Sequence, residues 1–144
     1  MPVELLVNID VDDLERATAF YLGAFGLGIG RRLGADGIEL LGASSRIYLL
    51  VKPAGSRAIG SPDRTRDYGR HWTPVHLDIV VPDVEAAVRR AVAAGAVLES
   101  GVASHAWGRI AMLGDPFGHG FCLIQFSERG YDALAARDVE DRSS

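Results

Sequence analysis

The chain has 144 residues, of which 48% are hydrophobic and 24% are charged, and its formal net charge is −4. This composition predicts one soluble globular domain. It argues against a nucleic-acid surface, which needs clustered Lys and Arg, and against a membrane helix, which needs about 18 consecutive apolar residues. A single cysteine and an acidic N-terminus without a secretion signal predict a cytoplasmic location.

The chain contains an internal repeat. Residues 6–15 and 76–85 each read as an apolar strand followed by the acidic start of a helix. Equivalent positions, such as Asp13 and Asp83, stand 70 residues apart. Because a repeat of this kind organises the whole fold, the chain is expected to fold as two similar halves.

A helix is expected after the first strand of each half. In the first half, apolar residues recur at helical spacing from Leu14 to Phe25, and Asp12 can cap that helix at its start while Gly26 can end it. In the second half the apolar stripe begins at Val84, and Gly95 stops it.

Three short strands are expected after each helix, because β-branched and aromatic residues lie there between Gly and Pro breaks. They cover 30–33, 37–41 and 47–52 in the first half, and 97–99, 109–113 and 120–125 in the second. Each half is therefore a β-α-β-β-β module in an α+β fold. Within one domain, 1–144, we predict modules at 3–52 and 74–127, a linker at 53–73 and a tail at 128–144.

Side chains along a strand alternate between its two faces. On the first strand of each half, the continuously apolar face is expected to pack on the helices. The mixed face then lines a hollow. On this mixed face the repeat relates Leu6 to His76 and Asn8 to Asp78. On the last strand of each half it likewise relates Tyr48 to Cys122.

The doubled module, the helix start DVDDLERATAFY and the pair Trp107-Gly108 followed by Asp115-Pro116-x-Gly118 resemble the vicinal oxygen chelate superfamily. This superfamily includes glyoxalase I, extradiol dioxygenases and bleomycin-resistance proteins. The resemblance covers nearly everything from Val3 to Phe126. It implies that the two modules form a curved mixed sheet around a cleft.

In metal-dependent members, the resemblance implies one ligand on the first strand and one on the last strand of each module. These positions fall on Leu6, Tyr48, His76 and Cys122. Only His76 is a usual ligand, whereas divalent metals need several donors at fixed geometry. We therefore expect no metal and no other cofactor. The alternative is a divalent metal at His76, with partners such as Asp78, Glu39 or Cys122.

Seven side chains are expected to bind a ligand: Asn8, Tyr48, His76, Asp78, Trp107, Arg109 and Cys122. His76 and Asp78 are also candidates for acid-base catalysis, since imidazole transfers protons near neutral pH. The other interpretation of His76 is a cavity-lining residue that hydrogen-bonds a ligand or a neighbour. Cys122 is either a nucleophile or, more often for a lone cysteine in an apolar strand, a packing residue.

Three aromatic residues, Tyr48, Trp72 and Trp107, can stack on a flat ligand, and the two tryptophans can instead plug the core. Arg109 either binds an anionic group or forms an ion pair with Glu39 or Glu99. His119, between two glycines, is expected to serve a tight bend and to lie on the opposite strand face from Cys122.

These observations favour a metal-free protein that binds or sequesters a small aromatic or hydrophobic molecule. The resemblance to bleomycin-resistance proteins implies a homodimer with clefts between the chains. The alternative is a lyase, isomerase or dioxygenase that uses His76, with or without a metal. A third hypothesis is a structural or regulatory dimer that binds no ligand.

Overall fold

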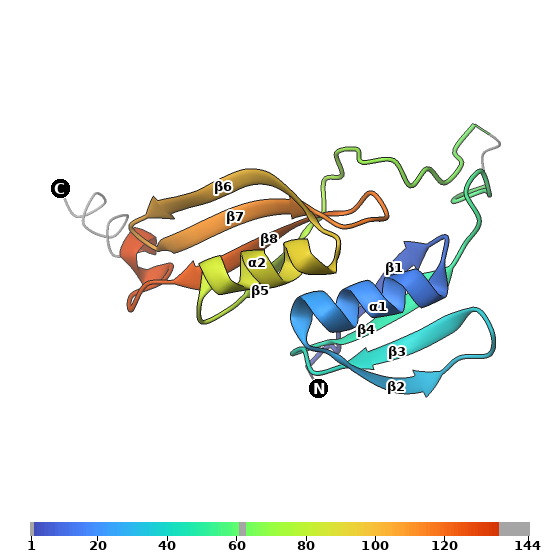
Figure 1. Ribbon diagram of the computed structural model, residues 1–144, viewed down its shortest axis with the longest axis horizontal. Coiled ribbons are helices and arrows are strands. Elements are labelled where there is room, and N and C mark those ends of the chain that lie inside the picture. The colour runs from blue at the N-terminus through green and yellow to red at the C-terminus, as the bar shows by residue number, and fades with distance from the viewer. Residues whose placement is uncertain (1, 61–62, 136–144) are drawn as a thin grey trace.

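The computed structural model describes residues 2–60 and 63–135, so the end of the predicted tail, 136–144, lies outside the described residues. The first module comprises β1 (Leu6–Val11), α1 (Leu14–Phe25), β2 (Gly28–Arg32), β3 (Gly37–Leu41) and β4 (Arg46–Val51). The second comprises β5 (Leu77–Val80), α2 (Val84–Ala94), β6 (Val97–His105), β7 (Gly108–Gly114) and β8 (Gly120–Phe126). The predicted α+β fold with two β-α-β-β-β modules is confirmed (Figure 1).

Each module builds its own four-stranded sheet. The strand orders are β1-β4-β3-β2 and β5-β8-β7-β6. The first strand of each module runs parallel to the last, and the remaining pairs are antiparallel. The parallel pair needs a long connection, which the helix and the two middle strands supply. The structure thus has two mixed sheets related by the repeat.

The helix ends follow local chemistry. Asp13, in extended conformation at φ −142°, caps α1 by accepting a hydrogen bond from the Arg16 backbone N–H at 3.0 Å. The expectation that Asp12 caps this helix is wrong, because the helix begins one residue later and only Asp13 stands directly before it. Asp83 caps α2 in the same way. Gly26 ends α1 in the left-handed conformation, as predicted.

The strand that follows α2 is longer than expected. It was predicted to end at Glu99 but continues to His105. Pairing with β7 carries it onward, with Ala103 opposite Ile110, through two irregularities in the register. Gly101 lies in one of these irregularities, between Ser100 and Ala103.

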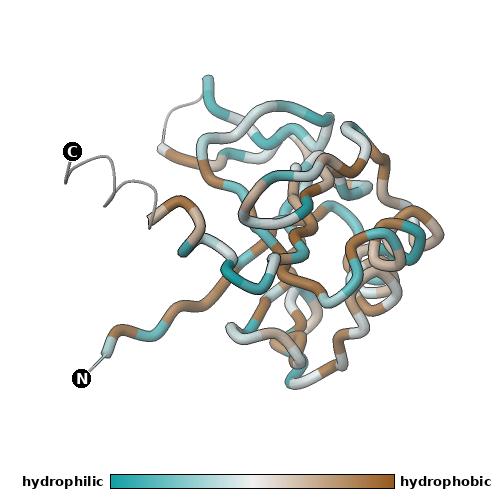
Figure 2. Tube along the Cα trace, turned by 90° about the vertical axis from the view of Figure 1, so that its left-hand side faces the viewer, coloured by the Kyte–Doolittle hydropathy of each residue, from teal (hydrophilic) through white to brown (hydrophobic). Residues whose placement is uncertain are grey.

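Both helices cover the same side of the molecule. Figure 1 shows α1 and α2 in front of the sheets, and in Figure 2, which is turned by 90°, the helical turns lie at the right-hand edge of the molecule. The two helices also contact each other. The core between helices and sheets contains Ile9, Val11, Phe20, Tyr21, Leu40, Leu49, Leu113 and Leu123. The predicted alternation on the first strand therefore holds, with Ile9 buried and Asn8 exposed.

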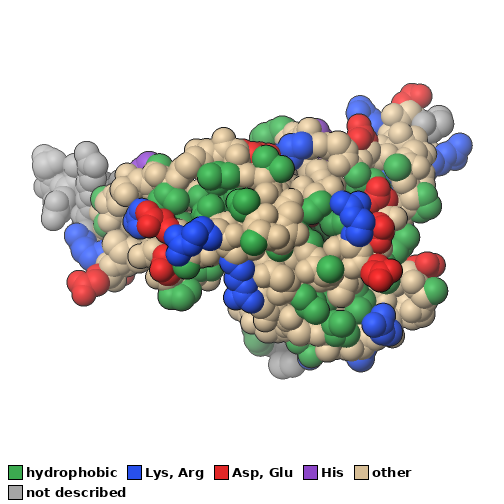
Figure 3. Space-filling model, viewed as in Figure 1, with side chains coloured by type: hydrophobic (Ala, Val, Ile, Leu, Met, Phe, Trp, Pro, Cys, Tyr) green, Lys and Arg blue, Asp and Glu red, His purple; other side chains and the backbone are tan. Residues whose placement is uncertain are grey.

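The sheet faces opposite the helices stay open. Leu6, Val80 and Met112 are large apolar residues that remain exposed on these inner faces. Residues 2–5 run away from the body of the molecule (Figure 2). On the helical side, acidic and basic side chains lie beside one another (Figure 3). Among the described residues, no helix has the length and apolar character to span a bilayer.

Candidate functional site

Three chemically active side chains gather on the inner face of the second sheet. Asp78 on β5 stands opposite Cys122 on β8, because the parallel register pairs these positions. His76 directly precedes β5, and its Nε2 lies 3.3 Å from Asp78 Oδ1. Within the described parts of the chain, these three form the group whose possible metal-ligating atoms all lie within 4.8 Å of one another.

A cavity of about 150 Å³ opens beside this group. Its wall includes His76, Cys122, Met112 and Trp72, together with the charged side chains of Arg70 and Glu99 and with Thr73, Leu113, Gly120 and Phe121. His76 and Asp78 side chains are 53% and 41% exposed, respectively, whereas Cys122 is buried. A ligand in the cavity can therefore reach the imidazole from solvent. The thiol lies in the floor.

The thiol of Cys122 is not activated. Burial and then the negative charge of Asp78 raise its pKa to about 11. A nucleophilic cysteine needs the opposite shift, toward the thiolate at neutral pH. The arrangement therefore favours the packing interpretation of Cys122 over catalysis.

We expect Cys122 in the folded protein to react with iodoacetamide at pH 8 about tenfold or more slowly than in the urea-unfolded chain, because only the thiolate reacts. Intact-mass measurements over time give both rates. The variant Asp78→Asn should react faster than the wild type when folded, since one of the charges that raise the pKa is gone. Equal rates in the folded and unfolded chains would contradict this assignment.

On the inner face of the first sheet, Tyr48 and Glu39 occupy the positions equivalent to Cys122 and Met112. Tyr48 stands opposite both Asn8 and Glu39 in the register. Its hydroxyl donates to Glu39 Oε2 at 2.9 Å. Arg31 donates hydrogen bonds to the same carboxylate, from its Nη2 at 2.7 Å and from its Nε at 3.1 Å.

This network keeps Glu39 ionised. The hydrogen bonds from Arg31 are the main cause that lowers the pKa of Glu39 to about 2, although its side chain is only 5% exposed. The sequence hypothesis that Glu39 partners His76 is not supported. Glu39 belongs to the other sheet and is engaged by Arg31 and Tyr48.

Of the seven residues expected to bind a ligand, His76 and Cys122 line the cavity on the second sheet, and Asp78 lies beside it. Asn8 and Tyr48 belong to the first sheet, and Arg109 and Trp107 lie elsewhere in the second module. Arg109 forms an ion pair with Glu85 at 2.6 Å. The predicted pairing with Glu39 or Glu99 is wrong, because those carboxylates pair with Arg31 and Arg70. The sheet register aligns Arg109 with the start of α2 instead.

Trp107 packs in an aromatic cluster at the end of β6. Its ring stacks on His105 with centroids 5.2 Å apart and contacts Phe126 and Tyr131. Neither Trp107 nor Arg109 lines the cavity beside His76. The cavity instead includes Trp72 from the linker, for which the sequence left stacking and core packing open.

A buried carboxylate in the β7–β8 turn was not expected from the sequence. The Asp115 side chain is 0% exposed. Its Oδ2 accepts from the Tyr21 hydroxyl at 2.6 Å and lies 2.7 Å from Nδ1 of His119. Its Oδ1 accepts from the backbone N–H groups of Phe117 and His119, each at 2.8 Å. The Asp-Pro-x-Gly motif signalled the turn, but nothing local signalled the contact with Tyr21.

Opposing effects act on this carboxyl. Burial alone would raise the pKa of Asp115, but the hydrogen bonds and charge of His119, together with Tyr21, outweigh it and lower the pKa. The same contact orients the imidazole. Since a carboxylate only accepts, Nδ1 of His119 carries the proton.

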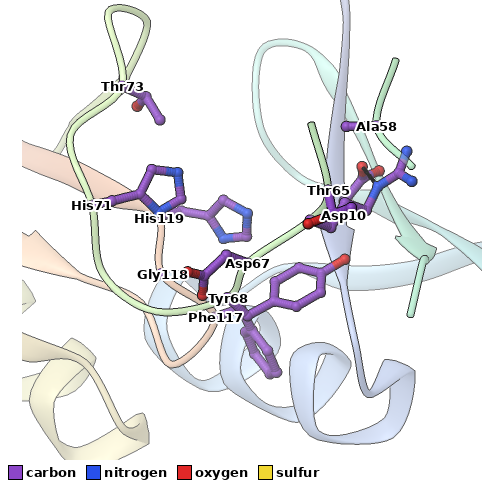
Figure 4. A pocket seen from close by; sticks show the side chains of 11 residues that line it. Asp10, Ala58, Thr65, Asp67, Tyr68, His71, Thr73, Phe117, Gly118 and His119 are labelled. Atoms are coloured by element: carbon purple, nitrogen blue, oxygen red, sulfur yellow. Dashed lines mark hydrogen bonds and ion pairs between the residues drawn. The ribbon is translucent and has the colours of Figure 1, made fainter. Parts of the chain in front are cut away.

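His119 lines a second cavity, of about 430 Å³, between the linker and the β7–β8 turn. Figure 4 shows its ring on the same side of this cavity as His71, with Asp67 and Tyr68 below them. Asp10, whose carboxylate forms an ion pair with Arg66 at 2.9 Å, also lines this cavity. A third and larger hollow, about 720 Å³, follows the open edge of β5 and is mostly apolar.

The chain is similar to known proteins both in sequence and in fold. Residues 6–124 match the family model described as a glyoxalase-like domain. A protein of Mycobacterium bovis is 34% identical over 123 residues, which cover 82% of this chain and 80% of that protein. A protein of Mycobacterium tuberculosis is also 34% identical over 123 residues, and this matched region covers 82% of this chain and 71% of that protein.

Solved structures share the fold at low identity. A fosfomycin resistance protein from Listeria monocytogenes matches with a TM-score of 0.67 and 19% identity, over 90% of this chain and 97% of that one. A glyoxalase/bleomycin resistance protein/dioxygenase family enzyme from Burkholderia phytofirmans matches with a TM-score of 0.64 and 21% identity, over 85% and 97%. A lactoylglutathione lyase from Agrobacterium tumefaciens matches with a TM-score of 0.60 and 20% identity, over 87% and 94%.

Proposed function

The chain belongs to the glyoxalase-like domain family of the vicinal oxygen chelate superfamily, and from this premise we propose that it binds a small organic molecule without a metal ion. The ligand lies on the inner sheet faces and contacts the cavity beside His76. The observation that carries this proposal is the state of the donor groups on these faces. On the first sheet they are engaged by other side chains, and on the second sheet His76 and Asp78 are exposed while Cys122 is buried. This set suits hydrogen bonding to a ligand better than ligation of a metal ion.

In the first module, the positions equivalent to metal ligands hold Leu6 and Tyr48. Leu6 has no donor atom, and the Tyr48 hydroxyl already donates to Glu39. The carboxylate that contacts Tyr48, Glu39, forms an ion pair with Arg31 at 2.7 Å. Leu6, Tyr48 and Glu39 therefore offer an ion no unengaged ligand atom, although catalytic metals usually have three protein ligands.

In the second module, a metal ion would have to displace a proton from Cys122. Burial and the charge of Asp78 raise the pKa of this thiol to about 11, so ligation by the thiolate requires release of a proton that metal binding would have to offset. The donor set thus fits a divalent cation poorly. His76 and Asp78 remain available to hydrogen-bond a ligand.

The second sheet nevertheless favours one alternative, an enzyme that uses a divalent metal. Its support is the close approach of His76, Asp78 and Cys122, whose possible ligand atoms lie within 4.8 Å of one another. In addition, a variant of the fosfomycin resistance protein from Listeria monocytogenes was solved with Mn(II). His76 with Asp78 as an acid-base pair is the metal-free form of the same alternative.

We further propose a cytoplasmic homodimer. Apolar residues on the inner faces, namely Leu6, Val80 and Met112, are exposed in the single chain. Contiguous exposed apolar surface marks an interaction site. A second copy would cover it and close the cleft over the ligand.

Native mass spectrometry of untagged protein tests these proposals, combined with metal analysis of the same sample. The expected result is a dimer with less than stoichiometric metal and a bound small molecule. Stoichiometric metal that is lost in His76→Ala but retained in the control His105→Ala would overturn the metal-free proposal in favour of the enzyme. A dimer that carries nothing and binds nothing in a thermal-shift screen would favour the structural or regulatory hypothesis.

A further inference from the structure

The linker places a short segment, 68–72, against the β7–β8 hairpin, and we call this segment the strap. Three glycines of the hairpin make room for it. A Cβ at Gly118 would lie 2.7 Å from the backbone oxygens of Tyr68 and Gly69. A Cβ at Gly120 would collide with the guanidinium group of Arg70, and one at Gly114 would lie 2.9 Å from Oε2 of Glu99 and 3.3 Å from Cδ of Arg70. The strap therefore lies in a groove that exists because these positions lack side chains.

A two-point ion pair holds the strap in the groove. Arg70 donates to Glu99 on β6 through Nε at 2.6 Å and through Nη2 at 3.0 Å. Its Nη1 also donates to the backbone oxygen of His71. A paired arginine of this kind fixes direction as well as distance. The backbone immediately before Trp72 is thereby positioned.

Trp72 itself packs little against the protein. Its side chain lines the cavity with His76, Met112 and Cys122, yet the residue is 81% exposed. A large exposed aromatic beside a cavity is typical of a binding surface. The cavity volume of about 150 Å³ equals about five water molecules at about 30 Å³ each. That space suits one aromatic ring with a small substituent.

Other residues in the wall of the cavity contribute a polar imidazole and two polarisable sulfur atoms. Nε2 of His76 lies 3.3 Å from Asp78 Oδ1. Because a carboxylate only accepts, Nε2 is the nitrogen that carries a proton toward it, and Nδ1 is the ring nitrogen left for a ligand. The sulfur atoms of Met112 and Cys122 lie in the same wall, and sulfur contacts aromatic rings favourably.

We propose that Trp72 is a specificity-determining residue, which selects a single-ring aromatic ligand that carries a hydrogen-bond donor on its edge. The indole stacks on the ligand ring, and His76 accepts from the donor. Arg70 and Glu99 are positioning residues, which act through Trp72. This inference rests on the proposed small-molecule function and names the class of ligand for the same site.

Three small probes separate the parts of this inference: phenol has a ring and a donor, toluene a ring alone, and cyclohexanol a donor alone. Binding is measured by NMR titration of the ¹⁵N-labelled protein. Phenol is expected to bind most tightly. Trp72→Ala should weaken phenol binding about three- to tenfold, as expected for loss of one stacked pair, and abolish the preference for phenol over cyclohexanol.

Two variants in the second module, Trp107→Phe and Arg109→Gln, serve as matched controls. Trp107→Phe alters the other tryptophan, which is outside the cavity, and should leave phenol binding unchanged. Arg70→Gln should weaken phenol binding in the same direction as Trp72→Ala, whereas Arg109→Gln, which breaks the ion pair with Glu85, should not. Because Trp72 is exposed, Trp72→Ala should retain the wild-type melting temperature.

Phenol binding that is equal in Trp72→Ala and the wild type would overturn the inference while leaving the proposed function intact. Equal binding of cyclohexanol and phenol to the wild type would overturn it too. If the probes bind nowhere and the purified protein also carries and binds no small molecule, the proposed function itself fails.

Discussion

Replacing Asp115 by alanine is expected to lower the free energy of unfolding by about 3–5 kcal/mol, because it removes one member of a buried charged network. The carboxylate is fully buried and takes part in four polar contacts. Without it, the Tyr21 hydroxyl and two backbone N–H groups lose their acceptor inside the protein, and unsatisfied buried donors are costly. Urea unfolding followed by circular dichroism measures the change.

Two comparisons make this prediction specific. Asp83→Ala also removes an aspartate that accepts a backbone hydrogen bond, but at an exposed helix cap, and should cost only about 1 kcal/mol. Tyr21→Phe removes one of the four contacts and should cost less than Asp115→Ala. A loss for Asp115→Ala no larger than that for Asp83→Ala would show that the buried network does not hold the turn to α1.

Asp115 also makes the free energy of unfolding depend on pH. Because the folded-state pKa of Asp115 lies below its ordinary value, the carboxylate contributes stability above the unfolded-state pKa of about 3.9. That contribution is lost as the pH falls through the lower, folded-state pKa. In Asp115→Asn, the free energy of unfolding should therefore fall less steeply below about pH 4 than in the wild type.

Replacing Gly118 by alanine is expected to cost about 3 kcal/mol, from backbone strain and steric overlap together. Gly118 has φ +88°, a conformation that side chains disfavour, and its Cβ would lie 2.7 Å from the backbone oxygens of Tyr68 and Gly69. Relief of the overlap requires the strap to move away from the hairpin. The free energy of unfolding and the NMR shift of the Trp72 indole N–H measure the two effects.

Gly34→Ala is the matched control, since Gly34 has φ +65° but nothing lies within 4 Å of its Cβ position. It should show backbone strain alone, about 1 kcal/mol, and no shift of the Trp72 signal. If Gly118→Ala cost no more than Gly34→Ala, the strap would not be packed against the turn as described.

The sequence alone predicted the two modules, because hydrophobic periodicity, caps and turn residues act over a few neighbouring positions. The 70-residue spacing from Asp13 to Asp83 and the stops at Gly26 and Gly95 are local signals of this kind. The alternation of strand faces also followed, whereas the parallel register that sets Asp78 opposite Cys122 came from the structure.

Only the tertiary structure decided which charged and aromatic side chains meet. Tyr21 and Asp115 are 94 positions apart, and their contact exists because α1 packs beside the β7–β8 turn. Arg109 pairs with Glu85, and Glu99 with Arg70, because sheet register and linker path choose among several carboxylates of equal charge. Local pattern carries no information about that choice, since it depends on how the two modules and their connecting segment pack together.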